Sequence, residues 1–130
     1  MANEAVTIET PTEFAVYTVA DGTAIPLNTL MQLSGDFTIT ASSGKDVWGG
    51  VQWEEKTISD GITRCTVALN GVHDLTCAAS AVTLGSQVCL SGANLIRVAI
   101  AADLLLGKVI GKAEEAGSAG DIVRVRVGAT

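Results

Sequence analysis

The chain has 130 residues, of which 48% are hydrophobic and only 4% aromatic, and its formal net charge is −6. This length fits one ordinary domain that can bury a core of its own. An acidic chain does not supply the positive potential that attracts nucleic-acid phosphates, which argues against direct nucleic-acid binding. No apolar run approaches the ~20 residues of a membrane span, so we predict no membrane partner either.

The N-terminal segment, residues 1–13, is polar and acidic, and only Val6 and Ile8 interrupt that character. We predict that it forms an N-terminal arm in front of a β domain over residues 14–130. Two interpretations of the arm remain open. It pairs with something outside its own fold, or it is a disordered terminus.

The remaining chain reads as a series of short β-rich runs separated by turn residues. Turn signals that recur every eight to twelve residues indicate an all-β fold, a small single-domain barrel or sandwich. Residues 100–106 are the only plausible helix, and Gly107 is its expected stop. No internal repeat and no dividing linker is apparent. The expected strands are 14–19, 25–33, 37–40, 47–53, 62–69, 72–75, 87–90, 95–98, 109–114 and 122–127.

Two pairs of residues predict local backbone features within this series. The glycines at 49 and 50 indicate a β-bulge or a close backbone approach. Asn70-Gly71 lies between two apolar runs, a pattern typical of a tight hairpin. Trp48 and Trp53 flank the first pair, and we interpret them as core anchors in preference to contact residues.

The last strand carries the clearest pattern in the chain. Its valines at 123, 125 and 127 fall on one face, and Arg124 and Arg126 fall on the other. Turn chemistry at residues 117–121 joins it to the strand at 109–114, which predicts a hairpin that closes the domain. The two arginines would meet a carboxylate on a partner or on the acidic N-terminal half.

Charge and cysteine content bear on the environment of the protein. Residues 61–106 contain only four charged side chains, which is typical of a protein interface and equally of a large buried core. The three cysteines are Cys65, Cys77 and Cys89. Their odd number, the lack of an apolar leader and the lack of a CxxC pair predict free buried thiols in a reducing compartment and no zinc site.

Candidates for catalysis are few. His73 is the only histidine; it points away from Asp74 on a strand, no GxSxG elbow is present, and a surface or hairpin position is the expected role. The segment 107–112 is one residue short of a phosphate loop and is followed by Ala113 where Ser or Thr is needed. The residues around Glu54, Glu55 and Lys56 read as a solvated turn or short helix, and Glu114-Glu115 as solvated charge. We therefore predict no enzyme, no catalytic, cofactor-binding or metal residues, and no cofactor.

Several stretches, in order, resemble small head decoration proteins of tailed phages, which are also known as capsid cement or head-fibre proteins. The resemblance extends from about Tyr17 to Gly128. The sequence departs from the family at Glu114, where the family has leucine, and at His73, where it commonly has phenylalanine. The stretches that carry it are residues 17–25 with 27–33, 69–75, 83–88, 101–107, 110–115 and 123–128.

The resemblance implies a β-tulip-like fold and a structural role without catalysis. Such a protein is made in the host cytoplasm and stabilises the virion from the outer capsid surface, as trimers at local three-fold positions. Its partners would be the major capsid protein and itself, and residues 1–13 would add a strand to an exposed capsid edge. The alternative is a small β-barrel that binds a carbohydrate or other ligand at the host surface, with Trp48 and Trp53 as stacking residues.

Overall fold

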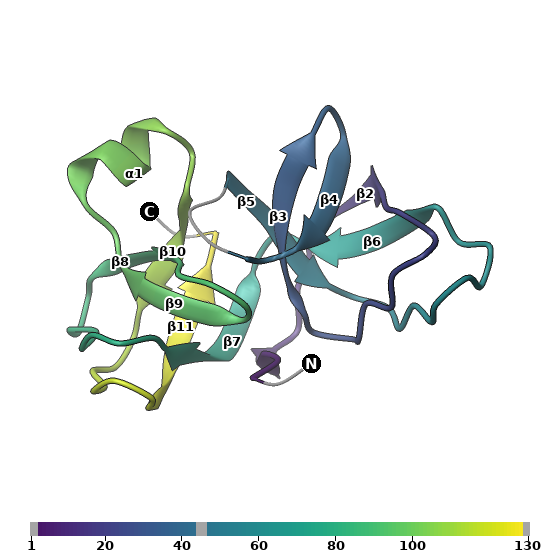
Figure 1. Cartoon of the computed structure of the whole chain (residues 1–130). Coiled ribbons are helices and arrows are strands. Elements are labelled where there is room, and N and C mark those ends of the chain that lie inside the picture. Colours follow the sequence, from purple (N-terminus) through teal and green to yellow (C-terminus); the bar gives the residue numbers. More distant parts are fainter. Residues whose placement is uncertain (1–2, 44–46, 129–130) are drawn as a thin grey trace.

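The computed structural model describes residues 3–43 and 47–128. Nearly all of its regular structure is β, which confirms the predicted fold class. The chain forms two small barrels that lie beside each other, the first built from residues in its N-terminal half and the second from its C-terminal half (Figure 1). The sequence pattern predicts one barrel or sandwich, whereas the structure contains two barrels.

The first barrel closes in the order β2-β4-β3-β5-β6. Its neighbouring strands are antiparallel, except that β2 and β4 run parallel and meet at Thr18 and Thr38. Its strands are β2 (Phe14–Thr18), β3 (Leu30–Gly35), β4 (Thr38–Ala41), β5 (Val47–Gln52) and β6 (Arg64–Ala68).

The second barrel follows the order β7-β11-β10-β8-β9 and closes through the parallel pair β7–β9. The helix α1 (Ala101–Leu105) lies between β9 and β10, and Gly107, with φ 70°, follows its end as predicted. Its strands are β7 (Gly71–Cys77), β8 (Gln87–Leu90), β9 (Leu95–Val98), β10 (Val109–Ala113) and β11 (Ile122–Val127). The β10–β11 pair is antiparallel, so the predicted closing hairpin is confirmed.

The two barrels repeat one topology, β2 to β6 corresponding in chain order to β7 to β11. The details repeat as well. Phe37 and Asn94 both take positive φ, 51° and 58°, in the turns after β3 and β8. The bulge at the paired glycines, which was predicted, lies between β3 and β5, and its equivalent lies between β8 and β10. The repeat is not visible in the sequence because a barrel needs only alternating apolar positions and suitable turns, and different residues satisfy these needs in the two barrels.

The Asn70-Gly71 hairpin prediction is wrong. Within the described residues β6 pairs with β2 and β5, and β7 pairs with β1, β9 and β11, so the dipeptide connects one barrel to the next. Gly71 has φ 100°, which suits glycine. The side-chain oxygen of Asn70 accepts hydrogen bonds from the backbone N–H groups of Thr12 and Glu13, at 2.8 and 3.0 Å. The turn preference is local, whereas barrel closure decides which strands pair.

The core is aliphatic and continuous between the barrels. One buried cluster combines Leu30, Val51 and Ala68 of the first barrel with most inward residues of the second. A smaller cluster, which includes Met31 and Ile39, fills the first barrel. The barrels therefore pack as one body.

The N-terminal segment is structured within its own chain. Residues Val6–Glu9 form β1, which pairs antiparallel with β7. Ala5 is buried, and its N–H donates to the carbonyl of Asn28 at 2.9 Å. Within the described residues of the segment that was expected either to reach another molecule or to be disordered, β1 therefore lies on the second barrel and Ala5 is bound to a loop of the first. The division into an arm (1–13) and a β domain (14–130) stays a prediction.

Candidate interaction surface

His73 has the environment of a structural residue. It is fully buried, against the expectation of a surface or hairpin position. Its Nδ1 lies 3.2 Å from the hydroxyl of Thr7 in β1, and its Nε2 lies 3.1 Å from the carbonyl oxygen of Asn70. Burial lowers its pKa, only partly offset by the contact with Asn70. Asp74 points to the other face and binds Arg124 at 3.2 Å, so the two neighbours do not form a catalytic pair.

Lys56 was expected in a solvated turn and is instead fully buried. Its Nζ donates to the backbone oxygens of Asp21 and Thr57 and to the carboxylates of Asp21 and Asp60, at 2.9–3.1 Å. The hydrogen bond from Lys56 is the main cause that lowers the pKa of Asp60 to about 2. This cluster joins two long loops of the first barrel, and its atoms satisfy one another, so it stabilises the fold.

The arginine face of β11 meets carboxylates from within the chain. Arg126 binds Glu114 at 3.0 Å and Glu9 at 3.4 Å, and Arg124 binds Asp74. Of the two predicted locations, a partner or the acidic N-terminal half, the second holds for Glu9 of β1 only, because Asp74 and Glu114 lie in the C-terminal half. All of these groups are partly exposed, so each pair contributes little stability.

Both tryptophans are partly buried and pack against the main core, which agrees with their interpretation as core anchors. Trp53 also contacts Phe14 in a tilted arrangement, with 5.7 Å between ring centroids and 51° between the ring planes. The three cysteines are free and buried, as predicted, and burial raises the pKa of each thiol, in the case of Cys89 to about 11.

Neither a metal site nor a membrane helix emerges from residues 3–43 and 47–128. These residues contain no group of three or more His, Cys, Asp or Glu side chains placed to hold a metal ion. None of their helices has the length and apolar character that crossing a bilayer requires.

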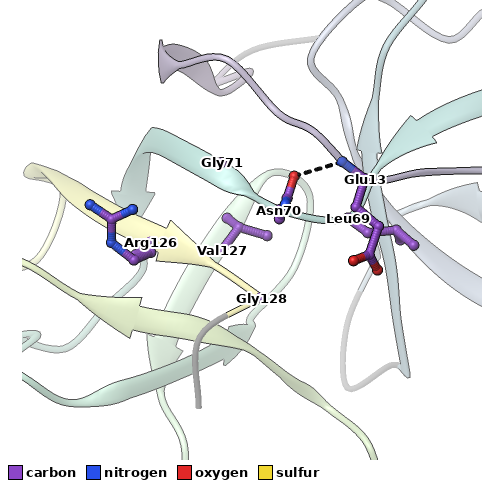
Figure 2. A pocket seen from close by; sticks show the side chains of 7 residues that line it. All are labelled: Glu13, Leu69, Asn70, Gly71, Arg126, Val127 and Gly128. Carbon is purple, nitrogen blue, oxygen red and sulfur yellow. Dashed lines mark hydrogen bonds between the residues drawn. The ribbon is translucent and has the colours of Figure 1, made fainter.

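A shallow hollow of about 330 Å³ lies where the two barrels join. Figure 2 shows Glu13 and Leu69 on one side of it and Arg126 on the other, with Asn70 and Val127 between them. The side-chain oxygen of Asn70 already accepts a hydrogen bond from the N–H of Glu13. Because one acid and one base are its only charged side chains, the hollow offers no reactive group, and we interpret it as a surface feature of the junction.

A group of exposed apolar residues lies at and beside α1. Leu105 is 87% exposed, and its neighbours are exposed by half or more. Figure 1 shows α1 at the end of the second barrel away from the first, where it projects from the strands. We call this feature the α1 tip, and it consists of Ile100, Leu104, Leu105 and Leu106.

A buried carboxylate holds the α1 tip in place. Asp103 accepts two hydrogen bonds from the guanidinium of Arg97, at 2.9 and 3.2 Å, and one from the N–H of Ile100 at 2.9 Å. The hydrogen bond from Arg97 is the main cause that lowers the pKa of Asp103 to about 2. A five-residue helix would fray without such support, so the ion pair fixes the leucines in an exposed position.

The sequence pattern predicts the helix at residues 100–106, which is confirmed, but not the exposure of its leucines. The signal was the run Leu104-Leu105-Leu106. Three successive residues cannot all face the same side of a helix, so at least one of them had to point away from the barrel.

No family model and no curated protein matches the chain. Among solved structures, the chain is similar to the N base of the head fibre protein gp8.5 of bacteriophage phi29. The two share 14% sequence identity with a TM-score of 0.56, and the match covers 88% of this chain and 94% of the other. The resemblance to phage head proteins is confirmed at the level of the fold. The likeness therefore extends over nearly the whole of both chains.

Proposed function

We propose that the chain is a structural protein of a phage virion that binds the outer surface of the capsid. The observation that carries the proposal is the fold, which is similar to that of a phage head fibre base over most of both chains. The ordered sequence motifs from Tyr17 to Gly128 support the same class of protein. Within the described residues His73, the only histidine of the sequence, is buried and held by Thr7 and Asn70, which fits a structural role for this residue.

The finer role that we propose is decoration of the capsid lattice by trimers at local three-fold positions, with the major capsid protein as partner. The α1 tip supports it, because exposed leucines on a fixed support lose little conformational entropy when they are buried. A tip of four apolar side chains is small, so a single contact would be weak. Three copies in a trimer would bind together and hold the shell against internal pressure through avidity.

The test is the copy number of this chain in purified virions, measured relative to the major capsid protein by quantitative mass spectrometry. A ratio that covers the lattice supports decoration. A few copies per particle would support a fibre role in place of a cement role. Absence from the particle would overturn the proposal.

A second measurement separates stabilisation from mere attachment. Capsids assembled without the chain are titrated with purified chain and then heated or treated with chelator. We expect bound chain to raise the temperature at which the capsids release their DNA. Bound chain without any change in release would reject the cement role.

A further inference from the structure

The repeated topology allows one barrel to be compared with the other, strand by strand. The N–H of Val19 donates to Thr63 at 2.9 Å, and the N–H of Cys77 donates to Asp121 at 2.8 Å. These two hydrogen bonds are equivalent, and they align β2 with β7. In this alignment Phe14 of β2 corresponds to Val72 of β7, and Val16 corresponds to Asp74.

In the second barrel an added strand covers this position. β1 pairs antiparallel along the first half of β7, with Val6 opposite Asp74 and Glu9 opposite Val72. The parallel partner β9 meets only the last two residues of β7, Thr76 and Cys77. Val72 is completely buried under this arrangement.

In the first barrel the same edge is open. β2 faces β6 through alternate residues, because the N–H of Leu69 donates to Glu13 and the N–H of Val19 donates to Thr63. The backbone groups of Phe14 and Val16 therefore point away from β6. Among the described residues no strand pairs with them on that side, and their side chains are 42% and 49% exposed.

We propose that this open edge of β2, formed by Phe14 and Val16, accepts an extended segment of a partner as an added antiparallel strand. The antiparallel pairing of β1 with β7 in the second barrel shows the geometry that we expect for this contact. The occupant to which we assign it is a segment of the capsid, an assignment that rests on the proposed function. The segment would be β-branched and apolar at alternate positions, to pack on Phe14 and Val16, and free of proline where its N–H groups face β2.

The size of the edge argues for the capsid over a second copy. Pairing of β2 with β2 of another copy would join only two short strands, far below the roughly 1,000 Å² that a stable interface needs. A single capsid strand would bury no more area than this, but the proposed trimer would present three such edges to the lattice together, and avidity compensates for weak individual sites. The roles of donor and acceptor of the added strand are then the reverse of those that the sequence implied. The N-terminal strand β1 is used within the chain, and β2 accepts a strand from the capsid.

The test measures amide hydrogen exchange of the full chain, free and bound to capsids assembled without it, with NMR detection after release. We expect the N–H groups of Phe14 and Val16 to exchange at least about tenfold more slowly in the bound state. Ala15 and Tyr17 are the internal controls. Their N–H groups face β6, so they are protected in both states.

A pair of variants tests the same edge by binding. Val16→Pro removes the outward N–H and leaves the β6 side intact, and proline is tolerated on an edge strand. We expect it to weaken binding to capsids about tenfold, the effect of one lost hydrogen bond. Val16→Thr keeps the N–H and a β-branched side chain, and should bind as the unchanged chain does. If Val16→Pro does not fold, the exchange measurement decides.

The outcomes distinguish this inference from the proposed function. Binding to capsids with unprotected Phe14 and Val16 amides overturns the strand contact and leaves the proposed function standing. Failure to bind capsids overturns both. Protection that appears in the chain alone as its concentration rises would identify a second copy as the occupant and overturn the capsid assignment.

Discussion

Lys56 occupies in the first barrel the position that Gly117 occupies in the second, and each forms the isolated β-bridge that joins two long loops of its barrel, to Ile25 and to Val82 respectively. A side chain at Gly117 would overlap the side chain of Val123. The side chain of Lys56 instead extends into a ring of oxygen atoms. The equivalent pair of loops is therefore held together by close packing in the second barrel and by a buried ion cluster in the first.

Replacement of Lys56 by methionine should therefore destabilise the chain. Methionine fills a similar volume but leaves the carboxylates of Asp21 and Asp60 without their shared cation. We expect a clear fall in Tm, measured by circular dichroism. Lys112→Met is the control, because Lys112 is exposed, and its Tm should not change. Equal effects of the two changes would contradict a role for the cluster.

Stability should fall in acid over a defined range. The pKa values of Asp60 and Asp103 are lowered to about 2 from an ordinary value of 3.8, chiefly by their hydrogen bonds with Lys56 and Arg97. The unfolded chain takes up these protons first, so the stabilisation is complete above pH 4 and is lost as the pH falls towards 2. Thermal melts between pH 5 and pH 2 would show it.

Asp103→Asn tests whether Asp103 contributes to the loss of stability between pH 4 and pH 2. The variant lacks the charge that binds Arg97 and should lose about 2 kcal/mol at pH 7. It should also show a shallower decline between pH 4 and pH 2 than the unchanged chain. A decline of the same steepness would mean that Asp103 does not contribute to it.

The sequence predicted what local pattern controls. The alternation from Val123 to Val127 gave β11, and the run before Gly107 gave α1, because side-chain period and turn chemistry are local properties. The pairing of β6 and the burial of Lys56 depend on strands and loops distant in sequence. The hairpin prediction at Asn70-Gly71 was wrong for the same reason, because this dipeptide connects the two barrels and the strands on either side of it pair with other strands. The open edge of β2 is recognised only when the two barrels are compared. Their sequences do not reveal that they share a topology.

His73 should make stability depend on pH near neutrality. Burial lowers its pKa below the ordinary 6.5, so the unfolded chain binds the proton more readily than the folded one. Stability is complete above pH 6.5 and decreases as the pH falls below it. His73 is the only histidine, so His73→Phe should abolish the change in Tm between pH 7 and pH 5. A change that persists in the variant would assign it to other groups.

Gly111 of β10 lies directly against the backbone of β11. A Cβ at this position would overlap the backbone of Arg126 and Val127, which cannot move without breaking the closing hairpin. Gly111→Ala should cost about 3 kcal/mol in chemical denaturation, in the range of an overpacked core site. Gly22→Ala is the control, because no atom lies within 4 Å of its added Cβ, and it should leave the free energy of unfolding nearly unchanged.

The α1 tip should determine binding without affecting folding. Leu105→Asp places a charge on a side chain that is 87% exposed, so the free energy of unfolding should change by less than about 0.5 kcal/mol. Burial of the unpaired carboxylate against a capsid would be strongly unfavourable, so co-sedimentation with capsids should be lost. Ile58→Asp is the matched control, an exposed apolar residue in the loop before β6, at the other barrel. Ile58→Asp should leave co-sedimentation unchanged. If Leu105→Asp also left it unchanged, the contact would lie on the first barrel, at the open edge of β2, and the α1 tip would have another role.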